Sequence, residues 1–70
     1  MKYKVGDIVR DKDGDISKVI AVYANIGRYD VRIIRGKDRG MTILVGRILD
    51  LRLRGAKVLS RLERILLEID

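Results

Sequence analysis

The fold of this chain is decided by its opening, which reads Lys4-Val5-Gly6-Asp7-Ile8-Val9-Arg10, then Asp13-Gly14, then Ile16-Ser17-Lys18-Val19-Ile20-Ala21-Val22. Short apolar runs on either side of Gly6-Asp7 predict two strands, Tyr3–Val5 and Ile8–Arg10. Asp13-Gly14 predicts a type I′ hairpin turn, because these residues readily adopt the positive φ angles that the turn requires. Ile16–Tyr23 is rich in β-branched residues and predicts the next strand.

Further strands are predicted over Arg28–Arg35, Met41–Val45 and Arg47–Arg54. Arg28–Arg35 alternates strictly, which is typical of a strand with one buried and one solvated face. The alternation places Tyr29, Val31 and Ile33 on one face and Arg28, Asp30 and Arg32 on the other. The pattern changes from period two to helical period near Gly55.

The helical segment carries an apolar stripe that spans about 120° of one face. Its members are Val58, Leu59, Leu62, Ile65, Leu66 and Ile69. The sequence Ser60-Arg61-Leu62-Glu63 fits a capping box, so the helix starts either near Ala56 or at Ser60. We favour the earlier start, because Val58 and Leu59 already lie on the stripe. Leu67 and Ala56 lie on one flank of the stripe.

The 70 residues are expected to form a single domain, mainly β with a C-terminal α-helix. Four or five short strands followed by one helix resemble an SH3-like small barrel. This resemblance implies a five-stranded antiparallel barrel over residues 1–54 and an amphipathic helix over residues 55–70. Val5-Gly6-Asp7-Ile8-Val9 and the later Ser17–Val22 segment are most similar to the KOW/Tudor-like group. Ser17 stands where that group usually has glycine, which favours a general SH3-like barrel over a true KOW module.

The chain is also similar to the seven-kilodalton archaeal chromatin proteins over Lys2-Tyr3-Lys4 and Asp15-Ile16-Ser17-Lys18. These proteins are basic SH3-like barrels that place an exposed Trp and apolar wedges in the DNA minor groove. Because this chain has no Trp, the resemblance implies that Tyr29, Met41 or Ile43 replaces those contacts.

Positive charge is concentrated in the middle of the chain. Residues 1–27 have a net charge of +1, residues 28–54 of +5 and residues 55–70 of zero. A basic block on a small domain attracts polyanions, although a solvated surface explains the same charge. The excess predicts a nucleic-acid-binding site formed by Arg28, Arg32, Arg35, Lys37, Arg39, Arg52 and Arg54.

The loop Arg35-Gly36-Lys37-Asp38-Arg39-Gly40 is the best candidate for a phosphate-contacting loop, with a solvated hairpin as the alternative. With three tyrosines as its only aromatic residues, the chain lacks a platform for stacking single-stranded bases. The sequence therefore favours a non-enzymatic protein that contacts the backbone of duplex DNA.

Several other functional classes find no support in the sequence. There is no His or Cys, and the hydroxyls of Ser17, Thr42 and Ser60 have no obvious activating base, so no catalytic residue or cofactor is predicted. The acidic run Asp11–Asp15 fails the spacing of a calcium loop, so no metal site is predicted. The sequence shows no signal peptide or apolar span, and we expect a cytoplasmic protein without a membrane partner.

The C-terminal helix has two interpretations. It packs on the open end of the barrel, or it joins another chain, as a homodimer or with a protein partner. The second interpretation assigns the contact to Val58, Leu62, Ile65, Leu67 and Ile69. The spacing of Val58, Leu62, Ile65 and Ile69 is that of a coiled-coil seam. The alternative function is therefore a protein-interaction or assembly module.

Overall fold

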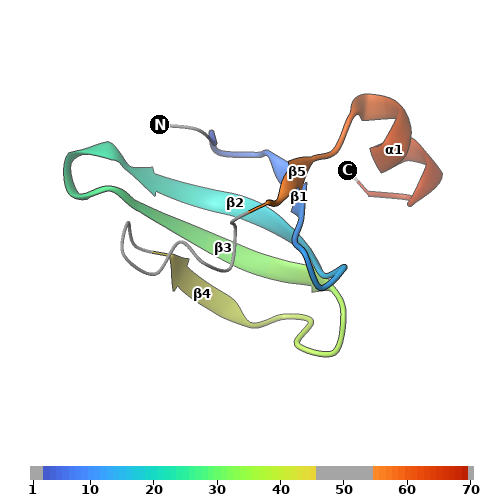
Figure 1. Cartoon of the computed structure of the whole chain (residues 1–70), viewed down its shortest axis with the longest axis horizontal. Helices are drawn as coiled ribbons and strands as arrows, with labels where there is room; N and C mark the ends of the chain where they lie inside the picture. The colour runs from blue at the N-terminus through green and yellow to red at the C-terminus, as the bar shows by residue number, and fades with distance from the viewer. Residues whose placement is uncertain (1–2, 46–54, 70) are drawn as a thin grey trace.

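The computed structural model describes residues 3–45 and 55–69, which form an antiparallel sheet and a short C-terminal helix (Figure 1). The strands are β1 (Ile8–Arg10), β2 (Ile16–Tyr23), β3 (Arg28–Arg35), β4 (Thr42–Val45) and β5 (Lys57–Val58), in the order β4-β3-β2-β1-β5. The 3₁₀ turn η1 (Ala24–Ile26) joins β2 to β3, and the helix is α1 (Arg61–Leu66). The predicted mainly β fold with five antiparallel strands and a C-terminal helix is confirmed. The predicted strand Arg47–Arg54 lies outside the described residues.

The opening of the chain is a turn and not a strand, so the predicted strand Tyr3–Val5 is wrong. Val5 and Gly6 form the turn, in which the Asp7 amide donates to the Lys4 carbonyl at 3.0 Å. Gly6 adopts a φ of 94°, which is sterically open to glycine but rarely to other residues. The Val-Gly-Asp motif thus leads the chain into β1.

The β1–β2 hairpin also differs from the predicted type I′ turn. Its ends are joined by the Asp11 amide, which donates to the Asp15 carbonyl at 2.9 Å across a three-residue connection. Among those three residues only Gly14 has a positive φ. The Asp11 carboxylate accepts hydrogen bonds from the amides of Asp13 and Asp15 at 2.9 and 3.0 Å. The Asp11 side chain thus pairs the backbone amides of the turn, and Asp13 does not adopt the left-handed conformation that a type I′ turn would require.

The helix starts at Arg61, so the favoured start near Ala56 is wrong. Lys57 instead pairs with Arg10, and Val58 with Val9, as β5. Ser60 caps the helix through a complete capping box: its hydroxyl accepts from the Glu63 amide at 3.2 Å, and the Glu63 carboxylate accepts from the Ser60 amide at 3.1 Å. Strand pairing thus determines where the helix begins.

Within the described residues, no helix has the length and apolarity of a membrane span.

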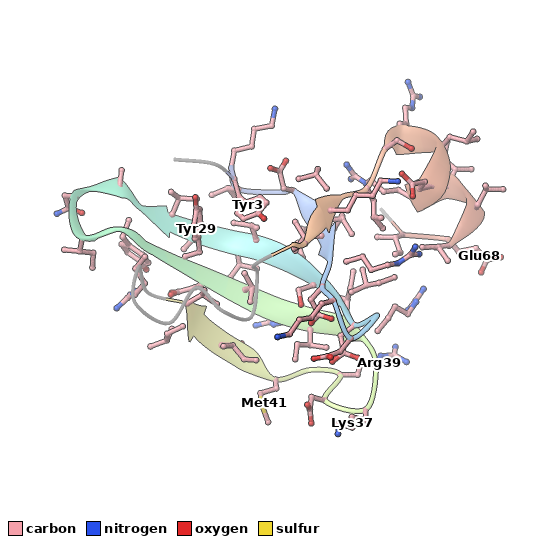
Figure 2. All side chains as sticks on the ribbon, in the orientation of Figure 1. Tyr3, Tyr29, Lys37, Arg39, Met41 and Glu68 are labelled. Carbon is pink, nitrogen blue, oxygen red and sulfur yellow. The ribbon has the colours of Figure 1, made fainter. Side chains whose placement is uncertain are left out.

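The sheet buries side chains on both of its faces. The first cluster gathers on one face and consists of Tyr3, Val9, Val19, Tyr29, Val31 and Val45. In it the rings of Tyr3 and Tyr29 meet edge to face with centroids 5.3 Å apart (Figure 2), and the Tyr29 hydroxyl accepts from the Tyr3 amide at 3.1 Å. The predicted inward orientation of Tyr29, Val31 and Ile33 is confirmed, since each is at most 6% exposed.

The second cluster lies on the opposite face and consists of Ile8, Ile16 and Leu59. Leu67 and Ile69, which follow α1, and Ile34 of β3 pack against it. The C-terminal segment therefore covers one end of this face, next to β1 and β5 (Figure 1). The remainder of the face carries charged side chains together with the exposed Tyr23 and Leu44.

Candidate nucleic-acid interface

All basic residues of the described strands lie on one face of the sheet. Residues that oppose each other in an antiparallel pair project to the same side. The register pairs Lys18 with Arg32, Tyr23 with Arg28, Arg10 with both Ile16 and Lys57, and Ile16 with Arg35. We call this side the basic face, defined by Arg10, Lys18, Arg28, Arg32, Arg35 and Lys57. The second cluster lies on the same side at the end covered by the C-terminal segment.

Lys18 and Arg32 face each other directly at the centre of the basic face. Both are exposed, and neither has an acidic partner among the described residues. Thr42 of β4 continues this row beyond Arg32, and Ile8 of β1 continues it beyond Lys18. Like charges directly opposite each other in a sheet are destabilising. The row is therefore a place where an anion would relieve repulsion.

Arg28 lies farther along the same face and is held by two neighbours. Its guanidinium lies 4.3 Å from the centre of the Tyr23 ring, within the range of a cation–π contact. Its Nε lies 3.2 Å from an Asp30 carboxylate oxygen, without the alignment of a hydrogen bond. The carboxylate offsets the charge of Arg28, so this residue offers less positive potential than Arg32.

Arg35 has a structural partner in the C-terminal segment. Its Nη2 donates to the Leu67 carbonyl at 3.1 Å, across 32 residues of sequence. Leu67 is the C-cap of α1, where backbone carbonyls lack helical partners and a cation is favourable. Arg35 therefore fastens the end of α1 to the sheet. At the edge strand, Lys57 Nζ lies 3.5 Å from the Glu63 carboxylate.

The loop between β3 and β4 carries Lys37 and Arg39, which project from the end of the molecule opposite η1 (Figure 2). It lies beside the tip of the β1–β2 hairpin, and the two form an open hollow lined by Asp13, Asp15, Lys37 and Asp38. Three carboxylates around one ammonium group disfavour a phosphate at this position. The described residues contain no cluster of acidic groups arranged to hold a metal ion.

The structure divides the predicted basic site. Arg28 and Arg32 share the basic face, Arg35 is engaged by Leu67, and Lys37 and Arg39 lie on a loop with acidic neighbours. Arg52 and Arg54 lie outside the described residues. Sequence reasoning missed Lys18 and Arg10, which strand pairing brings to the same face. Counting residue pairs outward from the β2–β3 turn does not place Lys18 opposite Arg32, because β2 contains an extra residue near Ile20 that shifts the register.

The apolar residues predicted for self-association separate into two groups. Leu62 and Ile65 are exposed on α1, and Val58 is exposed on β5. Leu67 and Ile69 are half-buried against the second cluster, and Ala56 packs against the first. Part of the C-terminal segment therefore completes the core while α1 itself leaves its aliphatic side chains in solvent.

Of the three residues suggested as substitutes for the minor-groove wedges, Tyr29 is buried, Ile43 is packed against the first cluster and Met41 is 53% exposed at the start of β4. The three side chains therefore do not form a common exposed wedge.

Comparison of the chain with protein-family models, with curated proteins and with solved structures finds no match.

Proposed function

We propose that the chain is a non-enzymatic nucleic-acid-binding protein whose basic face contacts the phosphate backbone of duplex DNA. Arg32, Lys18 and Arg10 are the contacting residues, because they are exposed cations without an acidic partner in the part of the chain that the structure describes. Arg28 flanks them beside Tyr23. We also propose that the sheet belongs to an SH3-like barrel, since its strand order and Val-Gly-Asp opening fit that class.

The observation that carries this proposal is the direct opposition of Lys18 and Arg32. Without a bound ligand, two cations directly opposite each other destabilise the sheet. A phosphate placed between them interacts favourably with both. The opposite face of the sheet offers no comparable charge, because its described strand residues are apolar apart from the buried Ser17. The charge segregation gives the domain one side suited to a polyanion.

Duplex is favoured over single-stranded nucleic acid because none of the three tyrosine rings is free to stack on a base. Tyr3 and Tyr29 are buried in the first cluster, and Arg28 lies over the Tyr23 ring. Single-strand binding without sequence preference relies on aromatic rings on which successive bases stack. Backbone contact requires only cations at suitable spacing.

The test is a titration of duplex DNA over a salt series. Three phosphate contacts predict a slope of log K against log salt of about −2.7, since each contact contributes about −0.9 on B-form DNA. Lys18→Gln and Arg32→Gln should each reduce the slope by about 0.9 and weaken binding on all sequences alike. Lys12→Gln is the matched control, because Lys12 is an exposed cation in the β1–β2 turn and does not belong to a strand of the sheet.

Two outcomes contradict the proposal. The first is an absence of DNA binding by the wild-type chain at low salt. The second is an equal loss of affinity in Lys12→Gln and Lys18→Gln, which would mean that net charge matters and the basic face does not.

The alternative function, a protein-interaction module, is favoured by a different observation. The helix α1 exposes three aliphatic side chains, which nucleic-acid binding does not explain.

A further inference from the structure

The helix α1 presents its apolar side to solvent. Leu62 is 64% exposed, Ile65 60% and Leu66 73%, and no residue of the helix is buried. At 100° per residue these three positions fall within about 100° of the helix circumference and form one continuous surface. We call Leu62, Ile65 and Leu66 the α1 patch. An amphipathic helix that packs only on its own domain turns such a stripe inward.

Local hydrogen bonds explain why the helix is turned this way. Glu63 is engaged with Ser60 through the capping box and with Lys57 at 3.5 Å, which turns the polar side of the helix toward β5. At the other end, the Ile69 amide donates to the Arg64 carbonyl at 2.8 Å and the Glu68 amide to the Ile65 carbonyl at 3.0 Å. This is the Schellman pattern, and it directs Leu67 and Ile69 back onto the second cluster.

We propose that the α1 patch binds a second copy of this chain, with the two helices antiparallel about a two-fold axis. The charges that border the patch favour this occupant. Arg61 is exposed at the start of α1, and Glu68 is exposed just beyond its end (Figure 2). Antiparallel pairing brings Arg61 of each copy near Glu68 of the other, so one self-complementary surface forms two ion pairs around an apolar centre. Parallel pairing would instead place like charges together.

The patch is small, and its size determines the expected strength of the dimer. Three side chains cover far less than the roughly 800 Å² per partner of a standard stable interface. We therefore expect weak association that depends on protein concentration, and the experiment is designed for a dissociation constant on the order of 100 µM. This inference is independent of nucleic-acid binding, because the α1 patch contains none of the cations assigned to that surface.

The experiment is sedimentation equilibrium of the full chain between about 10 µM and 1 mM. The wild-type mass should rise from one chain toward two across this range. Leu66→Lys should remain a single chain throughout, and a lysine near a helix C-terminus is compatible with the helix dipole. Ile26→Lys is the matched control: Ile26 is 59% exposed in η1, at the far end of β2 and β3 from α1 (Figure 1), and this variant should associate like the wild type.

Charge exchange tests the antiparallel arrangement. Arg61→Glu and Glu68→Arg should each weaken association several-fold, and the double variant should restore it. An amide spectrum and a thermal melt verify that every variant is folded, and Leu62→Gln replaces Leu66→Lys if the latter is not. A wild type that is monomeric at 1 mM overturns the proposal and leaves the patch to a foreign protein or a lipid surface. Unchanged association in Leu66→Lys, or a double variant no better than the single ones, also overturns it.

Discussion

Replacing Arg35 with glutamine separates a structural role from a binding role within the predicted basic site. Arg35 belongs to the basic segment, and its charge alone suggests a phosphate contact. In the structure its Nη2 donates instead to the Leu67 carbonyl at 3.1 Å. Arg35→Gln removes this hydrogen bond and leaves the C-cap carbonyl of α1 to solvent. We therefore expect this variant to lower stability.

The magnitude follows from the type of bond and its exposure. A hydrogen bond from a charged donor contributes about 1.5–3 kcal/mol when it is buried. Arg35 is only half-buried, so solvent screening reduces this to about 1 kcal/mol. For a domain of this size a loss of about 1 kcal/mol lowers Tm by about 4–8 °C. The Leu67–Ile69 segment should also lose hydrogen-exchange protection before the central strands do.

The assay compares thermal melts and amide exchange of Arg35→Gln with those of Arg39→Gln. Arg39 is an exposed arginine on the β3–β4 loop, so its replacement should change stability by less than about 0.5 kcal/mol. The structural role of Arg35 would be refuted if Arg35→Gln and the wild type had equal Tm values and the same amide exchange at Leu67–Ile69. Arg35 would then not anchor the C-terminal segment to the sheet.

Two further predictions concern turns and caps. Gly36 has a φ of 125°, and a Cβ there would overlap the Asp15 carboxylate, whereas Gly14 has a φ of 87° and open space at that position. Gly36→Ala should therefore destabilise the fold by about 1–3 kcal/mol and more than Gly14→Ala, and denaturant melts that rank them the other way would contradict this. The backbone hydrogen bond from Ser60, with further help from the Ser60 hydroxyl and Lys57, holds the pKa of Glu63 below its ordinary value. Because the folded-state pKa is the lower one, the capping contribution is complete above the ordinary value of about 4.3 and is lost as pH falls through the folded-state pKa. A carboxyl-carbon NMR titration should show the pKa of Glu63 below its ordinary value in the folded wild type, and an unshifted pKa would contradict this.

Much of the fold was predictable because its signals are local. The alternation of Arg28–Arg35 correctly placed Tyr29, Val31 and Ile33 in the core. The capping box was visible in Ser60-Arg61-Leu62-Glu63, but the favoured helix start was wrong. The error arose because Val58 fits an apolar stripe equally well as a strand residue, and only its pairing with Val9 decides between the two.

The candidate site was less predictable because its geometry depends on register. Counting outward from the pair Tyr23–Arg28 would place Lys18 opposite Ile33. The bulge at Ile20 shifts the pairing by one residue, and Lys18 then faces Arg32. The residues around Ile20 carry no local signal of this extra residue, so the register could not be read from the sequence.

The sequence by itself determined the four strands β1 to β4, the positions of the turns that join them and the excess of positive charge in the middle third of the chain. Those properties follow from side-chain periodicity, from glycine and aspartate conformations and from composition. The tertiary structure decided which cations stand together on the basic face, that Arg35 fastens the C-terminal segment, and that the α1 patch faces solvent. These depend on which residues, distant in sequence, become neighbours when strands pair and helix ends are capped.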